Sequence, residues 1–265
     1  MIDKVVQLPV LRVTEQGESK IEDMVVKEFP LTIILNNQEL ATLLCTPENL
    51  EYLAIGFLSS EGLIESKGEI RKMILDRHRG VVRVETEGDK ELERELLFKR
   101  LITSGGGRGA AFHTAADTIS EARVESQMRI SAAEVVALTR EFQHRSQVYR
   151  TTGGVHSAAL CDTENILVFA EDIGRHNAID KIFGRCLLEE IPTDDRIIIT
   201  SGRITSEILL KVAKRNIPII ISRSAPTDLA VGLAADLGIT LIGFVRGKRM
   251  NIYSDGWRVS SEGVE

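Results

Sequence analysis

The sequence predicts an α/β protein in which a smaller N-terminal α+β part precedes a C-terminal part built on a mostly parallel sheet. From residue 166 onward, short apolar runs alternate with amphipathic helical patterns, and this alternation is typical of βα units. Before residue 98 the chain instead shows short strands, hairpins and isolated helices. A glycine-rich stretch at residues 103–109 separates the two patterns. We therefore expect an N-terminal domain over residues 1–100 and a C-terminal domain over residues 101–265.

The N-terminal part is predicted to contain two hairpins. The first joins two apolar or β-branched runs, residues 32–35 and 40–45, through Asn36 and Asn37. Asparagine tolerates positive φ, so a tight turn is expected at this point. The second hairpin is expected to turn near residues 79–80.

Two helices are also predicted in the N-terminal part. Thr46 is expected to be the N-cap of the first helix, with Pro47 at its first helical position. Apolar residues at three- and four-residue steps between residues 50 and 58 then form its buried face. Residues 89–100 are predicted to form a charged, amphipathic helix.

The C-terminal part is predicted to alternate between strands and helices. A capping box formed by Ser131 and Glu134 indicates a helix start, and two glycines precede a buried strand at residues 156–160. The other predicted elements are strands at residues 166–170, 197–200, 217–221, 241–245 and 251–254, and helices at residues 176–190, 205–215 and 227–237.

Arginine occurs in each of the four loops that follow a predicted strand of the C-terminal sheet. Such loops emerge at one edge of a parallel sheet, and three of them also open a helix whose first backbone N–H groups favour anions. We call this set the arginine edge; its members are Arg175, Arg203, Arg223, Arg246 and Arg249. Mutual repulsion makes such a cluster costly unless an anion neutralises it, and arginine suits bidentate phosphate contacts. The sequence therefore predicts a phosphate-bearing, nucleotide-like ligand.

The turn at residues 171–177 is dense in ionisable side chains, among them Asp172, Arg175 and His176. Two interpretations are open: a solvated turn whose charges pair locally, or an acid–base pair of Asp172 and His176 in a nucleotide-processing enzyme. An ordinary ATPase or NAD enzyme is not expected, because the sequence has no Walker A pattern and no Gly-x-Gly-x-x-Gly after a strand.

Composition limits the classes of partner. A net charge of -6 and an aromatic content of 5% over 265 residues give no sign of nucleic-acid binding. No apolar run approaches the roughly 18 residues of a membrane span, and the N-terminus lacks a signal-peptide pattern, so we expect a cytoplasmic protein without membrane contact. Cys45, Cys161 and Cys186 are far apart and form no Cys-x-x-Cys pair. Neither a disulfide framework nor a metal site, including structural zinc, is expected.

Several longer motifs, in one order along the chain, resemble the FdhD family of formate dehydrogenase accessory sulfurtransferases. They occupy residues 29–33, 55–62, 152–156, 171–181, 201–203, 222–227 and 243–249. The resemblance implies a cytoplasmic homodimer that carries sulfur from a cysteine desulfurase to the molybdenum cofactor of formate dehydrogenase, bis-molybdopterin guanine dinucleotide. It also implies a cytidine-deaminase-like fold for the C-terminal domain, without the deaminases' zinc chemistry, because their His-x-Glu and Pro-Cys-x-x-Cys signature is missing.

The family's cofactor-binding segment overlaps the arginine edge. It matches Phe244, Val245, Arg246, Gly247, Lys248 and Arg249. Together with Arg175, His176, Arg203 and Arg223, these residues form the predicted cofactor site. The agreement is expected physically, because the cofactor carries two pyrophosphates.

The family's sulfur-carrying cysteine has no counterpart in this chain. It belongs to a loop of the form Thr-Ser-x-Cys-Gly, and Gly106 stands at that catalytic position. A persulfide needs a thiolate, which glycine lacks. The three cysteines elsewhere are expected to pack as small hydrophobic residues. Two functions are therefore alternatives: the sulfur carrier that the family implies, or a non-catalytic chaperone that only binds the molybdenum cofactor.

Overall fold

The computed structural model describes residues 4–87, 101–102, 108–109 and 123–261. The predicted helix over residues 89–100 and the expected persulfide position Gly106 lie outside the described residues. On either side of residues 103–107, strand β7 (Leu101–Ile102) pairs antiparallel with strand β8 (Arg108–Gly109).

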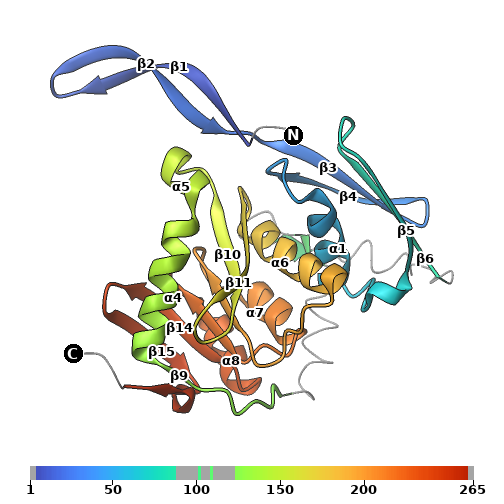
Figure 1. Cartoon of the computed structure of the whole chain (residues 1–265), viewed down its shortest axis with the longest axis vertical. Coiled ribbons are helices and arrows are strands. Elements are labelled where there is room, and N and C mark those ends of the chain that lie inside the picture. The colour runs from blue at the N-terminus through green and yellow to red at the C-terminus, as the bar shows by residue number, and fades with distance from the viewer. Residues whose placement is uncertain (1–3, 88–100, 103–107, 110–122, 262–265) are drawn as a thin grey trace.

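The chain forms packed layers, which Figure 1 shows from the N-terminal sheet at the upper right to helix α4 at the lower left. A four-stranded sheet covers helix α1 (Leu50–Ser60), which packs on helix α6 (Arg175–Glu189). Helices α6, α7 (Ser206–Ala213) and α8 (Asp228–Asp236) cover one face of a six-stranded sheet. Helix α4 (Ala132–Arg145) covers the opposite face. The predicted mixture of strands and helices is confirmed.

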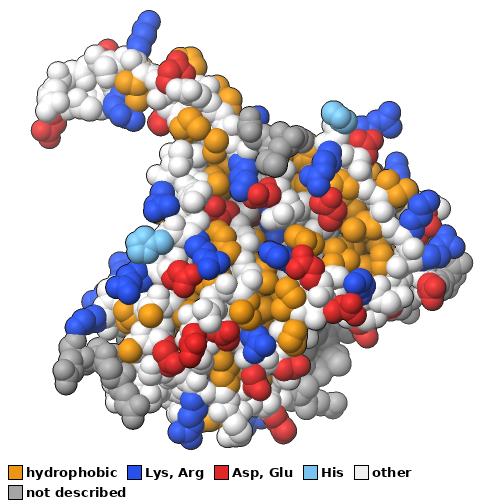
Figure 2. All heavy atoms as spheres, in the orientation of Figure 1, with side chains coloured by type: hydrophobic (Ala, Val, Ile, Leu, Met, Phe, Trp, Pro, Cys, Tyr) orange, Lys and Arg blue, Asp and Glu red, His pale blue; other side chains and the backbone are white. Residues whose placement is uncertain are grey.

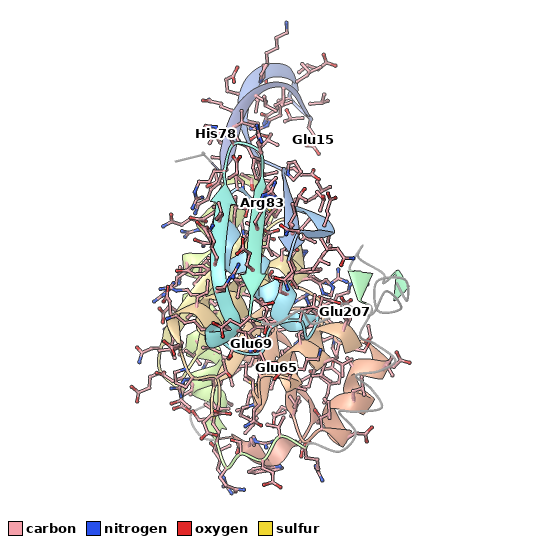
Figure 3. All side chains as sticks on the ribbon, turned by 90° about the vertical axis from the view of Figure 1, so that its right-hand side faces the viewer. Glu15, Glu65, Glu69, His78, Arg83 and Glu207 are labelled. Atoms are coloured by element: carbon pink, nitrogen blue, oxygen red, sulfur yellow. The ribbon has the colours of Figure 1, made fainter. Side chains whose placement is uncertain are left out.

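The N-terminal sheet has the strand order β4-β3-β6-β5. The bounds are β3 (Phe29–Leu35), β4 (Gln38–Cys45), β5 (Ile70–Asp76) and β6 (Val81–Thr86), with the 3-10 turn η1 (Lys67–Glu69) before β5. Both predicted hairpins are confirmed, and Asn36 and Asn37 have φ values of 46° and 66°. In Figure 3 this sheet faces the viewer, with Arg83 on its solvent side.

Thr46 is not the N-cap that the sequence analysis expected. Helix α1 begins at Leu50, after Asn49, which has a left-handed conformation. Thr46 is buried, and its backbone N–H and its hydroxyl instead donate to Asp172 at 3.0 and 3.1 Å. The backbone N–H and the hydroxyl of Thr46 are therefore bound by Asp172, which is distant in the sequence, and Thr46 does not cap the helix.

A long hairpin precedes the N-terminal sheet, and the sequence analysis assigned no element to it. Strand β1 (Val5–Thr14) pairs antiparallel with strand β2 (Gly17–Val26), and the resulting arm extends away from the body (Figure 1). Figure 2 shows apolar side chains along this arm, and the large exposed ones among them are Leu8, Leu11, Val13 and Val25.

The C-terminal sheet is mixed, so the expectation of a mostly parallel sheet is wrong. The strand order is β11-β10-β12-β13-β14-β15, and only β12–β13 and β13–β14 pair in parallel. The bounds are β10 (His156–Cys161), β11 (Ile166–Asp172), β12 (Ile197–Thr200), β13 (Ile219–Ser222), β14 (Thr240–Arg246) and β15 (Arg249–Ser254). The reason is that β10 inserts between β11 and β12, antiparallel to both, while β15 folds back on β14 as a hairpin.

Strands β11 to β14 nevertheless run in one direction, since β10 is antiparallel to both β11 and β12. The loops after these four strands therefore leave the sheet at one edge, as the arginine argument requires. The remaining elements are α5 (Gln147–Thr152), β9 (Ile130–Ser131), η2 (Gly256–Arg258) and β16 (Val259–Ser260).

Helices α1 and α6 cross at a pair of glycines. A Cβ atom built on Gly56 would lie 1.8 Å from the carbonyl oxygen of Asp180, and one built on Gly184 would lie 1.8 Å from the carbonyl oxygen of Tyr52. No side chain fits at either position, because the obstructing atoms belong to the backbone. The two helices therefore approach each other as closely as their main chains permit.

Gly56→Ala is expected to lower the free energy of unfolding by about 3 kcal/mol or more, because the helices must separate to admit the methyl group. Gly232→Ala in α8 is the matched control, since a Cβ there meets no atom within 4 Å. That change is expected to stabilise the protein by about 0.5–1 kcal/mol through helix propensity. Urea unfolding measures both, and equal stabilities would show that the crossing is not tight.

Candidate functional site

Asp172, at the end of β11, is fully buried and forms an ion pair with Lys181 at 2.7 Å. Its Oδ1 accepts hydrogen bonds at 2.9 Å from the backbone N–H of Gly174 and from Nδ2 of Asn177. Its Oδ2 accepts from Thr46, to whose hydroxyl Lys181 also donates at 2.6 Å. The turn is thus neither solvated nor free for proton transfer: its carboxylate fixes the connection between the N-terminal and C-terminal layers.

His176 does not contact this carboxylate within hydrogen-bonding distance, so the acid–base pair of Asp172 and His176 is not formed. Its Nδ1 lies 3.6 Å from Oε1 of Glu207, which is too long for a hydrogen bond. Burial, followed by the positive charges of Lys211 and Arg175, lowers the pKa of His176 to about 2. The imidazole is therefore neutral at physiological pH.

A second buried ion pair joins α6 to α7, and Ser60 of α1 binds to it. Nζ of Lys211 donates to both carboxylate oxygens of Asp180, at 2.8 and 2.7 Å, and the hydroxyl of Ser60 donates to Asp180 Oδ1 at 2.6 Å. Nζ of Lys214 donates to the backbone carbonyl of Ser60 at 2.8 Å. These bonds fix the end of α1 against the middle of α6 and the end of α7.

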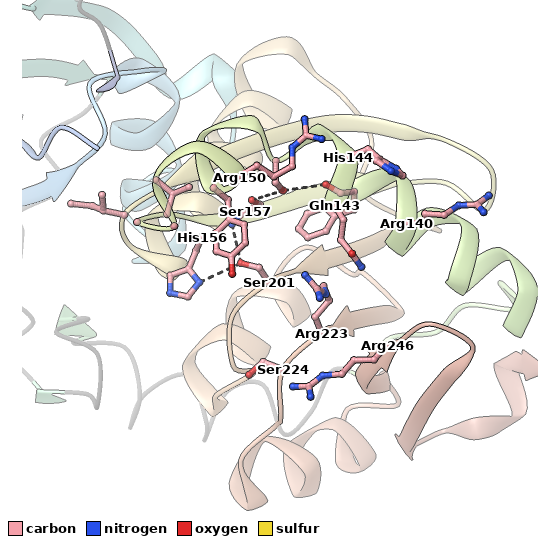
Figure 4. A pocket seen from close by; sticks show the side chains of 17 residues that line it. Arg140, Gln143, His144, Arg150, His156, Ser157, Ser201, Arg223, Ser224 and Arg246 are labelled. Atoms are coloured by element: carbon pink, nitrogen blue, oxygen red, sulfur yellow. Dashed lines mark hydrogen bonds between the residues drawn. The ribbon is translucent and has the colours of Figure 1, made fainter. Parts of the chain in front are cut away.

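A cavity of about 990 Å³ opens where the C-terminal strand ends meet α4 and α5. Figure 4 shows polar side chains converging on it from these elements. Its arginine and histidine side chains are Arg140, His144, Arg150, His156, Arg223 and Arg246. Among the described residues that line it, none is aspartate or glutamate. A cavity of this charge in a protein with a net charge of -6 is suited to an anion.

Hydrogen bonds that involve backbone groups connect the loops of the arginine edge. The hydroxyl of Ser222 donates to the carbonyl of Gly202 at 2.7 Å and accepts from the backbone N–H of Ser224 at 2.9 Å. The backbone N–H of Phe244 donates to the carbonyl of Ser224 at 3.1 Å. These bonds link the loop after β12 to the loop after β13, and the loop after β13 to strand β14 near its end.

The backbone is strained where Arg246 leaves the sheet. Phe244 has a φ of 53°, and the β14–β15 register shifts between Gly243 and Arg246. A Cβ on Gly243 would lie 3.0 Å from the ring of Tyr253, so only glycine fits there without displacement. The guanidinium of Arg246 lies 5.7 Å from the ring centroid of Phe244. Such local strain is typical of a functional site, and here it directs Arg246 into the cavity.

The structure divides the predicted site residues between different surroundings. Arg223 and Arg246 line the cavity, whereas Arg175 and His176 line a neighbouring cavity of about 390 Å³. Arg203 is exposed. Burial is the larger cause that lowers the pKa of Arg175, and the charge of Arg203 lowers it further. The rest of the predicted segment lies outside both linings: Phe244 is half-buried, Val245 is in the core, and Gly247, Lys248 and Arg249 form the exposed β14–β15 turn.

Sequence reasoning missed the cationic residues that α4 and α5 contribute. Arg140 and His144 come from the last turns of α4, and Tyr149 and Arg150 come from α5. The predicted helix start at Ser131 is confirmed by its capping box, but the helix was treated only as a core element. Arg140 and His144 are polar and lie one helical turn apart, and this spacing was the feature of the sequence that could have indicated their role.

Comparison with known proteins identifies the family. The pattern of the FdhD/NarQ family matches residues 26–260. The chain belongs to this family. It is 46% identical to the sulfur carrier protein FdhD of Bacillus subtilis (strain 168), over 98% of this chain and 99% of that one. The FdhD protein of Listeria innocua serovar 6a is 43% identical, over 91% and 93% respectively.

One solved structure is similar over nearly the whole fold. It is the crystal structure of a proposed formate dehydrogenase accessory protein from Desulfotalea psychrophila, with a TM-score of 0.78 and 28% identity. The match covers 97% of this chain and 100% of that chain. In the part of this FdhD/NarQ chain that the structure describes, no helix is long and apolar enough to cross a membrane.

All three cysteines of this FdhD/NarQ chain are described, and all are buried. Burial is the largest cause that raises the pKa of each thiol, to about 12 for Cys45, to about 11 for Cys186 and further for Cys161. A sulfur carrier needs an accessible thiolate, and these thiols are neither accessible nor ionised. The expectation that they pack as small hydrophobic residues is confirmed.

Stability is expected to fall as the pH drops below 6.5, partly because of His176. The unfolded chain protonates this residue near 6.5, whereas the folded chain does not until about pH 2, so protons bind preferentially to the unfolded state in between. Between pH 7.5 and 5.5 the residue should cost about 1.4 kcal/mol. Urea unfolding should show this loss in the native protein and its absence in His176→Gln.

The exposed His78 provides the control for this measurement. His78→Gln should keep the same loss of stability as the unsubstituted chain. An equal loss in His176→Gln would show that His176 is not buried in its neutral form.

Proposed function

We propose that this chain is an accessory protein for a formate dehydrogenase that binds the molybdenum cofactor, bis-molybdopterin guanine dinucleotide, by its phosphates. The observation that carries the proposal is the cavity that gathers Arg140, Arg150, Arg223 and Arg246, with no carboxylate among the described residues that line it. The name of the similar solved structure supports the class of target enzyme.

The chemistry of the cavity fits a diphosphate. Nε of Arg223 is buried and has no hydrogen-bond partner among the described residues. An unpaired buried guanidinium nitrogen costs free energy, and a phosphate oxygen would remove that cost. The hydroxyls of Ser201 and Ser224 also line the cavity and offer further donors. A volume of about 990 Å³ lies at the upper end of typical ligand pockets, as a large cofactor requires.

We further propose that sulfur is not carried on a thiol of this chain, so that its role is that of a cofactor-binding chaperone. Gly106 has no thiol, and the cysteines elsewhere are buried. The second candidate function is the sulfur carrier that receives sulfur from a cysteine desulfurase. It is favoured by the name of the relatives, which are called sulfur carrier proteins.

Arg246→Ala should weaken the binding of GDP by about tenfold or more. GDP carries one guanine and one diphosphate and therefore stands for one arm of the cofactor, and a charge-assisted arginine–phosphate hydrogen bond contributes about 1.5–3 kcal/mol. Arg249→Ala should have a smaller effect, because Arg249 pairs with Arg246 across the hairpin but lies outside the cavity. Isothermal titration calorimetry measures the affinities.

Arg71→Ala is the control for a loss of charge elsewhere, since Arg71 is exposed on the N-terminal sheet and pairs with Glu85. Its affinity for GDP should equal that of the native protein. If Arg246→Ala binds GDP as tightly as the control, the cavity is not the phosphate site.

The sulfur step is tested with Gly106→Cys. After incubation with a cysteine desulfurase and labelled cysteine, the variant should carry label as a persulfide and the native chain should not, because only the variant has a loop thiol. Mass spectrometry locates the added sulfur. If the native chain acquires label as readily, one of its cysteines is the carrier and the chaperone proposal is wrong.

A further inference from the structure

The second cavity, of about 390 Å³, holds a group of buried polar atoms with no hydrogen-bond partner among the described residues. They are Nε and Nη2 of Arg175, both ring nitrogens of His176 and Oε2 of Glu207. The side chains of His176 and Glu207 are only 10% and 14% exposed. Figure 3 labels Glu207 at the level where the N-terminal layers meet the C-terminal ones.

These atoms contrast with a neighbouring charged pair whose hydrogen bonds are satisfied. Asp180 and Lys211 also line this cavity, and they satisfy each other through two hydrogen bonds. Glu61 also lines this cavity and is half-buried. Arg175 and Glu207 carry opposite charges and face one cavity, yet they form no ion pair with each other among the described contacts. A ligand that bridges them would satisfy both.

The position of Arg175 is fixed by its contact with the loop after β12. A Cβ on Gly202 would lie 3.0 Å from Cβ of Arg175 and 3.2 Å from its Cδ, so the arginine stem packs directly on the glycine backbone. His156 and Ile173 line both this cavity and the larger one, so the two cavities adjoin. One ligand can therefore extend from the phosphate-binding arginines into the space between Arg175 and Glu207.

We propose that this cavity binds the 2-amino-4-oxopyrimidine ring that guanine and pterins share, with Glu207 accepting from the ring N–H and the exocyclic amine and Arg175 donating to the ring carbonyl. A carboxylate matches two adjacent N–H donors, and a guanidinium matches the neighbouring carbonyl oxygen. The apolar side chains of Leu44, Phe57 and Ile173 line the same cavity and provide surfaces for a flat ring. The inference rests on the proposed function and specifies which part of the ligand is read.

The test exchanges the hydrogen-bonding pattern at position 207. Xanthine has a carbonyl where guanine has the exocyclic amine, so Glu207→Gln, whose amide both donates and accepts, should prefer xanthosine diphosphate. Calorimetry should show that the native protein binds GDP at least tenfold more tightly than xanthosine or inosine diphosphate, which lack the amine. Glu207→Gln should lose at least tenfold for GDP and reverse the preference towards xanthosine diphosphate.

Glu39→Gln, an exposed change on β4, is the matched control and should keep the native preference. Thermal unfolding of each variant confirms that it is folded. Competition by 6-hydroxymethylpterin distinguishes the two sources of the ring. If the pterin displaces GDP from the native protein and does not bind to Glu207→Gln, the cavity accepts either ring. If the pterin binds but GDP does not, and Glu207→Gln no longer binds the pterin, the cavity is specific for the pterin.

The negative results distinguish a failure of the ring-binding inference from a failure of the proposed function. If Arg246→Ala weakens GDP binding but the native protein binds GDP and inosine diphosphate equally, the phosphate site stands and the ring-binding inference is wrong. If Glu207→Gln keeps the native preference, the inference is also wrong. If neither a guanine diphosphate nor a pterin binds at all, both the inference and the proposed function fail.

Discussion

The close crossing of helices α1 and α6 is the constraint on which the rest of the structure depends. Gly56 and Gly184 admit no side chain, so the two backbones touch, and four charged side chains of this region, Asp172, Asp180, Lys181 and Lys211, are buried. Charges placed there must pair, and they do: Asp172 with Lys181, and Asp180 with Lys211. Buried ion pairs contribute little net stability when their desolvation is counted. Their effect here is geometric, because each pair recruits a residue of the N-terminal part, Thr46 or Ser60, and so fixes the orientation of α6 and α7.

That orientation decides where the functional side chains lie. Helix α6 begins at Arg175, and Arg175 packs on Gly202, so the starts of α6 and α7 are fixed relative to the end of β12. The hydrogen bonds of Ser222 and Ser224 then connect the loop after β12 to the strained Phe244 in β14. Four loops that are distant in the sequence thus form one rigid edge. A rigid edge matters for binding, because arginines held in place lose less entropy when they engage a phosphate.

The arginine edge could be predicted from the sequence because the prediction depends only on the direction of the strands. Strands β11 to β14 share one direction even though the sheet is mixed, so the error about β10 did not move the loops that carry Arg223 and Arg246. The division into two cavities could not be predicted, since it depends on how α1 packs on α6 across more than a hundred residues. The same distance explains the error at Thr46, whose local pattern is that of an N-cap but whose partner is Asp172. Arg140 and Arg150 were missed because helix periodicity identifies the buried face and says nothing about what the other face meets.

Binding and sulfur transfer depend on different properties of this fold. The cation-rich cavity is formed by strand ends that backbone hydrogen bonds hold together, and none of the side chains that line it is a thiol. Its charge is also local: the chain carries 39 acidic and 33 basic residues, yet the acidic ones are absent from the described lining. Field lines concentrate in such a cavity, so a polyanionic ligand is attracted to it despite the net negative charge. The cofactor binding that we propose therefore does not depend on residue 106, since it requires only the packed edge.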